Sequence, residues 1–229
     1  MSTSRTRPPV PAQHAFAARR HEFVDLPLEQ RFARIFTTNL WSADSRSGLG
    51  SELTATAGVR EQLPRLLESL GAGSLLDLPC GDFGWLSTVA LDLDYTGGDI
   101  VADLVASNQE RFGGAGSRRR FLRLDLTADP LPRADVVLCR DCLVHLSFDH
   151  IRLAFENLRR SGSTWLLTTT FLDHHENTDI ESGDWRILNL TRPPFNLPDP
   201  EGVLVEGCLE SDGAYADKAL GLWRIADLP

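Results

Sequence analysis

The sequence has few of the features that mark secreted, membrane-spanning or metal-binding proteins. Its 229 residues include four cysteines, too few for a disulfide framework in a chain of this length. Cys139 and Cys142 have the spacing of a metal-ligand pair, but no second pair stands at a suitable spacing, so no metal site is expected. No apolar run approaches the roughly 20 residues that span a bilayer, and the polar N-terminal residues lack the apolar centre of a signal peptide. We therefore expect a cytoplasmic protein with reduced thiols and no membrane association.

Positive charge is also scarce. The chain carries 23 Lys and Arg against 32 Asp and Glu, which gives a formal net charge of −9. An acidic balance disfavours nucleic acid as a partner, and the basic run at 118–120 is typical of a solvated strand edge. The expected partner is a small molecule, and the composition leaves monomer and homodimer open.

One stretch, residues 74–86, organises the rest of the chain. Its apolar residues from 75 to 78 form a run of strand length, which breaks at 79–81 because proline and glycine do not continue a central strand. Apolar residues resume at helical spacing between 83 and 90. The pattern predicts a strand, a tight turn and a helix, with a ligand close to the backbone of the turn.

Two later strands end in carboxylates. The strand at 95–99 ends at Asp99, and the strand at 121–125 ends at Asp125. An acidic residue about 20 positions after a glycine-bearing turn is placed to accept hydrogen bonds from a ribose. Together with Asp77 before the turn, this series resembles the nucleotide-binding core of class I S-adenosylmethionine-dependent methyltransferases. In that family the first turn holds the methionine part, the second acidic residue holds the ribose hydroxyls, and the third lies by the adenine amine.

The resemblance implies S-adenosyl-L-methionine as the cofactor. The turn departs from the family's Asp-x-Gly-x-Gly-x-Gly pattern, because Gly81 falls on an expected glycine while Pro79 and Phe83 replace others. The turn has no Gly-Lys-Ser/Thr and no basic residue, and it carries Asp82, so a nicotinamide cofactor ranks lower. The implied cofactor-binding residues are Trp41, Asp77, Pro79, Cys80, Gly81, Asp99, Ile100, Asp125, Leu126 and Arg140.

The alternation of strand and helix patterns predicts an α/β fold. We expect a doubly wound, Rossmann-like, mainly parallel seven-stranded sheet with an antiparallel closing strand. Three parts follow along the chain: a flexible tail over 1–22, a helical cap or lid over 23–71 and the S-adenosylmethionine-binding catalytic core over 72–229. Helices are predicted at 27–40, 54–70 with a break at Pro64, 100–112 and 148–159, and the last strands at 134–140, 163–171, 203–209 and 219–225.

Two N-terminal segments each allow two interpretations. The amphipathic helix at 27–40 covers the sheet edge, closes over the cofactor, or does both. The small polar residues at 41–51 either fold over the methionine part or form a surface linker.

Candidate catalytic residues follow the fourth strand. Ligands of open α/β sheets bind at the carboxyl ends of the strands, and His145 and Asp141 lie there with suitable acid–base chemistry. His174 and His175 come next. The alternatives are that His145 caps a helix or fills a polar niche, and that Asp141 holds Arg140 or a backbone amide.

The irregular segment at 172–199 is long for a compact domain, which favours a functional role. We expect its Trp185 and Phe195 to anchor it to the core. The sequence thus predicts a methyltransferase acting on an O or N atom of a small molecule. Two alternatives remain open: another use of the cofactor (cyclisation or carboxypropyl transfer), and a non-catalytic binding subunit.

Overall fold

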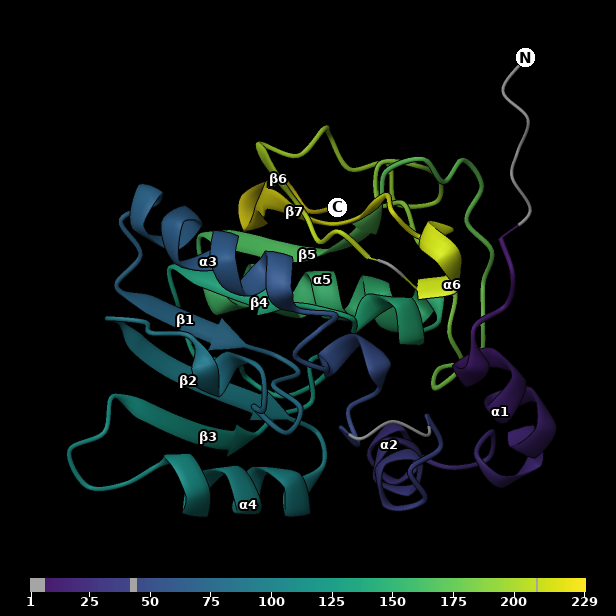
Figure 1. The fold of residues 1–229 in the computed structure, drawn as a ribbon, viewed down its shortest axis with the longest axis horizontal. Helices are drawn as coiled ribbons and strands as arrows, with labels where there is room; N and C mark the ends of the chain where they lie inside the picture. Colours follow the sequence, from purple (N-terminus) through teal and green to yellow (C-terminus); the bar gives the residue numbers. More distant parts are fainter. Residues whose placement is uncertain (1–6, 42–44, 209) are drawn as a thin grey trace.

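The computed structural model describes residues 7–41, 45–208 and 210–229, and its centre is one seven-stranded sheet. The strand order is β3-β2-β1-β4-β5-β7-β6, as Figure 1 shows. The strands are β1 (Ser74–Asp77), β2 (Asp94–Asp99), β3 (Arg119–Arg123), β4 (Val136–Cys139), β5 (Trp165–Phe171), β6 (Gly202–Val205) and β7 (Lys218–Arg224). Strands β1 to β5 pair in parallel, while β7 lies antiparallel between β5 and β6. The predicted mainly parallel sheet with an antiparallel closing strand is confirmed.

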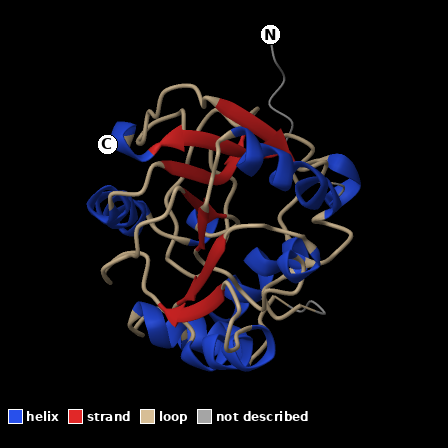
Figure 2. Cartoon of the chain, turned by 90° about the vertical axis from the view of Figure 1, so that its left-hand side faces the viewer, coloured by secondary structure: helices blue, strands red, loops and turns tan. Residues whose placement is uncertain are grey.

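Helices cover both faces of this twisted sheet (Figure 2). Helices α3 (Ala57–Ser69) and α4 (Ala102–Phe112) contribute to the apolar core on one face, and α5 (Phe148–Ser161) contributes to the core on the other. Successive strand residues point to opposite faces, so Leu75 joins the first core and Leu76 the second. Both faces are therefore apolar, as a parallel sheet requires.

The prediction of a helix after the first turn is wrong. The structure has only a short 3-10 turn, η3 (Leu86–Thr88), between β1 and β2. Phe83 adopts φ 57, which turns its ring into a cluster with Tyr95 and Phe121 at centroid distances of 4.8 and 5.2 Å. The Asp82 carboxylate accepts from the Gly84 amide at 2.9 Å and so stabilises a turn. The apolar residues between 83 and 90 are spaced as in a helix, but short turns instead of a helix bring them into the core.

The N-terminal residues are folded from residue 7 onwards, contrary to the tail predicted over 1–22. Helix α1 (Pro11–Arg19) buries Phe16, whose ring stacks on that of Phe23 at 5.4 Å. Arg7 pairs with Asp217 at 2.7 Å, which ties this segment to the far end of the chain. A single large apolar side chain in a polar stretch was too weak a signal to predict the helix.

The helices α2 (Leu28–Thr37) and α3 form where the apolar periodicity predicts them. Helix α3 continues through Pro64, so the predicted break there is wrong. An internal proline costs roughly 3 kcal/mol, but Leu63 and Leu67 beside it are both buried and hold the helix on the sheet. In Figure 1, α1 and α2 lie beyond the carboxyl ends of the parallel strands.

The segment between β5 and β6 has little regular structure but is well anchored. Phe195 is buried and meets the rings of Phe148 and Phe155 edge-on at 5.3 and 5.9 Å. The predicted anchoring role of Phe195 is confirmed, whereas Trp185 meets Phe171 at 6.1 Å and also lines a cavity, so it fits both anchoring and the alternative role of an aromatic wall for a substrate. Across the described ranges, no helix is long and apolar enough to cross a membrane.

Candidate active site

A cavity of about 1030 Å³, open to solvent on one side, lies at the carboxyl ends of the parallel strands. The carboxyl ends of the strands are the usual place for small-molecule and cofactor sites in open α/β sheets. All the residues predicted to bind the cofactor or act in catalysis line it, from Trp41 in the N-terminal part to His145 after β4. The sequence therefore predicted which side chains the fold brings together, although they come from five separate segments.

The turn after β1 forms one wall, and it depends on a glycine. Gly81 has φ 53, and a side chain there would place its Cβ 2.6 Å from the Ser47 hydroxyl. That hydroxyl accepts a hydrogen bond from the Asp82 amide at 3.0 Å, and Asn108 donates to the Gly81 carbonyl at 2.7 Å. The turn is thus fixed from both sides, with its backbone exposed to the cavity.

The carboxyl groups of Asp99 and Asp77 are buried and together form what we call the floor of this cavity. Asp99 accepts hydrogen bonds from the amides of Gly81 at 3.2 Å and Val101 at 3.0 Å. Burial raises the pKa of Asp99 to about 6 despite these bonds. Asp77 accepts from the Tyr95 hydroxyl at 2.7 Å, and burial raises its pKa to about 7. Because burial disfavours both negative charges, a ligand that brings positive charge or hydroxyl donors fits this floor.

The remaining walls are apolar. Ile100 and Leu126 follow β2 and β3, and Asp125 beside them accepts from the Thr127 hydroxyl at 2.6 Å. Helix α2 contributes a run of apolar side chains, which explains its amphipathic pattern. These are Leu28, Phe32, Ile35 and Phe36. A planar apolar group between α2 and the ends of β2 and β3 would therefore be enclosed from both sides.

His145 lies in a 3-10 turn, η4 (Leu143–His145), at the edge of the cavity. Arg186 fixes this turn by donating to the carbonyls of Leu143 and Leu146, both at 2.8 Å. The His145 ring stacks on Trp41 with a centroid distance of 4.7 Å. Within the described ranges the indole N–H of Trp41 is buried and has no hydrogen-bond partner.

The protonation state of His145 follows from its surroundings. Its Nδ1 lies 2.8 Å from the Asp184 carbonyl, which can only accept, so Nδ1 carries the proton and Nε2 keeps its lone pair. Burial lowers the pKa of His145 to about 4. The ring is therefore neutral at physiological pH, and the same burial makes its free Nε2 only a weak base.

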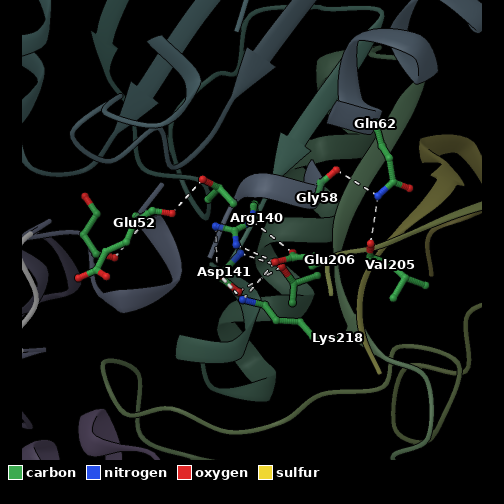
Figure 3. Close-up of polar contacts among 12 residues, drawn as sticks. Glu52, Gly58, Gln62, Arg140, Asp141, Val205, Glu206 and Lys218 are labelled. Atoms are coloured by element: carbon green, nitrogen blue, oxygen red, sulfur yellow. Dashed lines mark hydrogen bonds and ion pairs between the residues drawn. The ribbon is translucent and has the colours of Figure 1, made fainter. Parts of the chain in front are cut away.

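Asp141 belongs to a buried ion network with three other side chains, shown converging in Figure 3. Lys218 lies 2.7 Å from Asp141 and 3.5 Å from Glu206, while Arg140 lies 2.7 Å from Glu206 and 3.2 Å from Asp141. Burial would raise the pKa of Asp141, but Lys218 and Arg140 outweigh it and hold that pKa well below its usual range. Asp141 is therefore a fixed anion that holds Lys218 and Arg140.

A second cavity of about 640 Å³ adjoins the first. The two share Trp41, Ser47, Asp141 and His145. Residues that the sequence analysis missed line the rest of it, including Glu210, Tyr215 and Lys218 and the start of α1 at 10–12. The sequence did contain one signal for this site, because Lys218 begins the apolar strand β7. A buried lysine needs a charged partner, so acidic residues could have been expected nearby.

Other candidates lie elsewhere. His174 and His175 line neither of these cavities. Cys139 is fully buried in the sheet. Among the residues that the structure describes, no group of three or more His, Cys, Asp or Glu side chains could hold a metal ion.

Comparison with known proteins gives structural but no sequence matches. No family model and no curated protein match the chain. The 1,6-didemethyltoxoflavin-N1-methyltransferase of Burkholderia thailandensis, solved with 1,6-didemethyltoxoflavin and S-adenosylhomocysteine, is 17% identical with a TM-score of 0.54. That alignment covers 98% of this chain and 97% of that chain.

Shorter alignments match two further structures. The N-methyltransferase NodS of Bradyrhizobium japonicum, solved with S-adenosylhomocysteine, is 17% identical over 64% of this chain and 74% of that chain, with a TM-score of 0.49. The [4+2]-cyclase SpnF is 17% identical over 73% and 70%, with a TM-score of 0.47. At 17% identity and a TM-score of 0.54, the likeness to the toxoflavin enzyme shows a shared fold, which agrees with the Rossmann-like α/β fold that the sequence predicted.

Proposed function

We propose that the protein is an S-adenosylmethionine-dependent methyltransferase that methylates an O or N atom of a small molecule. One observation carries this proposal. A cavity lined by the predicted cofactor residues lies beside a second cavity, and the two share Trp41, Ser47, Asp141 and His145. Methyl transfer needs two ligands side by side with their reacting atoms close together, and adjoining cavities with a common boundary suit that requirement.

The first cavity fits the cofactor in each of its parts. The resemblance assigns the ribose hydroxyls to Asp99, whose carboxylate lies at the cavity floor, and the methionine part to the turn at 77–81. The apolar side chains of α2, with Ile100 and Leu126, provide surfaces for a purine ring. Buried Asp77 and Asp99 favour a ligand that carries an ammonium and a sulfonium group. When bound, S-adenosylmethionine supplies a methyl group for in-line displacement and leaves as S-adenosylhomocysteine.

The residues at the boundary orient the acceptor and hold a proton. Neutral His145 presents Nε2 as a proton acceptor for an acceptor hydroxyl or amine. The ion pair with Lys218 holds the pKa of Asp141 well below its usual range, so its carboxylate is a weak proton acceptor. Trp41 lies at the boundary, where its ring stacks on that of His145.

Calorimetric titration tests the proposal. S-adenosylhomocysteine should bind, and NAD should not. The Gly81→Ala variant should lose this binding because its Cβ would displace Ser47 and disturb the turn. Gly114→Ala is the matched control, since nothing lies within 4 Å of a Cβ placed there. Absence of heat with S-adenosylhomocysteine in the folded wild-type protein would contradict the proposal. A product analysis that finds methylthioadenosine instead of S-adenosylhomocysteine would point to another use of the cofactor.

A further inference from the structure

The second cavity is lined by three charged side chains, and only one of them is unpaired within the described ranges. Lys218 is held by Asp141 at 2.7 Å and by Glu206 at 3.5 Å. Glu210 lines the same cavity, and its carboxylate has no hydrogen bond or ion pair to any described residue. Arg140 joins Lys218 as a second cation, and the carboxylates near them are those of Asp141, Glu206 and Glu210. Two positive charges therefore face three negative ones, and the excess charge at this cavity is negative.

The backbone beside Glu210 is strained. Ser211 and Asp212 have φ values of 51 and 56, and Gly213 follows with 78. Consecutive left-handed residues other than glycine are costly, and such strain gathers at functional sites. Burial raises the pKa of Glu210, with Lys218 as the main opposing influence. A cation in the cavity would offset the energetic cost of burying the negative charge of Glu210.

Three aromatic side chains in contact with one another also line this cavity. Phe171, Trp185 and Tyr215 meet edge-to-face, with centroid distances of 6.1, 5.6 and 6.1 Å. On another side of this cluster, the Arg7 guanidinium already lies 5.9 Å from the Phe171 ring and 5.8 Å from that of Tyr215. Aromatic surfaces beside a carboxylate favour an organic cation over an anion.

We propose that Glu210 determines acceptor specificity by binding a protonated amine, so that the acceptors are aromatic compounds bearing a basic nitrogen. This inference rests on the proposed function, since it assigns the acceptor to the second cavity. An anionic acceptor is disfavoured, because both carboxylates that hold Lys218 would have to release it. A neutral acceptor would leave Glu210 without a partner in a half-buried position.

Three probes with the same phenol ring test this inference on protein saturated with S-adenosylhomocysteine. Tyramine carries an ammonium, tyrosol a hydroxyl and 4-hydroxyphenylacetate a carboxylate. By NMR titration, tyramine should bind at least about tenfold more tightly than tyrosol, and 4-hydroxyphenylacetate should bind most weakly. Glu210→Gln should bring tyramine to the affinity of tyrosol and leave S-adenosylhomocysteine unaffected, because Glu210 does not line the first cavity.

The control variant is Asp212→Asn, which removes an exposed carboxylate two positions away in the same turn and should change nothing. Equal affinity of tyramine and 4-hydroxyphenylacetate, unchanged tyramine binding by Glu210→Gln, or binding of none of the three probes would overturn the inference. The prior saturation step separates the two proposals. If S-adenosylhomocysteine itself does not bind, the proposed function fails first.

Discussion

Replacing Glu206 by glutamine should destabilise the protein far more than removal of an ordinary surface charge. The Glu206 carboxylate is 3% exposed and accepts from Arg140 Nε at 3.2 Å and Nη2 at 2.7 Å, with Lys218 at 3.5 Å. Glutamine keeps the shape but removes the charge, so that, among the described residues, Asp141 is the one carboxylate still paired with the two buried cations. Breaking a buried pair in this way costs about 3–5 kcal/mol. Because a domain is stable by only about 5–15 kcal/mol, this loss is a large share of the whole.

Urea unfolding followed by tryptophan fluorescence measures this loss. In a separate thermal unfolding experiment, the melting temperature should fall by roughly 6–20 °C, given about 2–4 °C per kcal/mol for a chain of this size. Glu201→Gln is the matched control, since Glu201 pairs with Arg224 at 2.9 Å while both side chains are about half exposed. That variant should lose under about 1 kcal/mol. A Glu206→Gln variant as stable as Glu201→Gln would refute the claim that the network is a closed set of buried charges.

The remaining predictions concern the first cavity. Asp99→Asn should weaken S-adenosylhomocysteine binding by about 1.5–3 kcal/mol, the scale of a lost charged hydrogen bond, with cooperative unfolding retained; a folding defect at unchanged affinity would make Asp99 structural. His145→Asn should reduce turnover about 10²–10⁴-fold with cofactor affinity within about threefold, and a lower melting temperature at full turnover would contradict this. In the wild type, the pKa of His145 near 4 places its protonation below pH 5, so an activity limb near pH 6.5 assigned to His145 would be inconsistent. The raised pKa values of Asp77 and Asp99, about 7 and 6, mean that the folded state binds their protons more tightly than the unfolded chain. Their contribution to the free energy of unfolding should therefore rise as pH falls from 8 to 5, and urea midpoints should show a smaller rise in Asp77→Asn.

The cofactor residues could be predicted from the sequence because they follow from local patterns and one topological rule. Segments of strand length that end at Asp77, Asp99 and Asp125 are visible along the chain. In a parallel sheet the carboxyl ends of such strands meet at one edge, so the cavity follows without knowledge of side-chain packing. Helix α2 could be predicted in the same way from its apolar period.

The second cavity could not be predicted, because long-range contacts create it. Lys218 pairs with both Asp141 and Glu206 only after β6 and β7 have paired beside β5. Nothing in the local sequence shows which acidic residue remains unpaired. The absent helix after the first turn has a similar cause, since Phe83 and its neighbours are buried by contacts with β2 and β3 instead of along one helical face.

A crystal structure of the complex with S-adenosylhomocysteine tests most directly the claim that methyl transfer takes place between the two cavities. The ribose should contact Asp99, and the sulfur should lie at the boundary formed by Trp41, Ser47, Asp141 and His145, facing the second cavity. A ligand outside the first cavity, or one whose sulfur points away from that boundary, would contradict the claim.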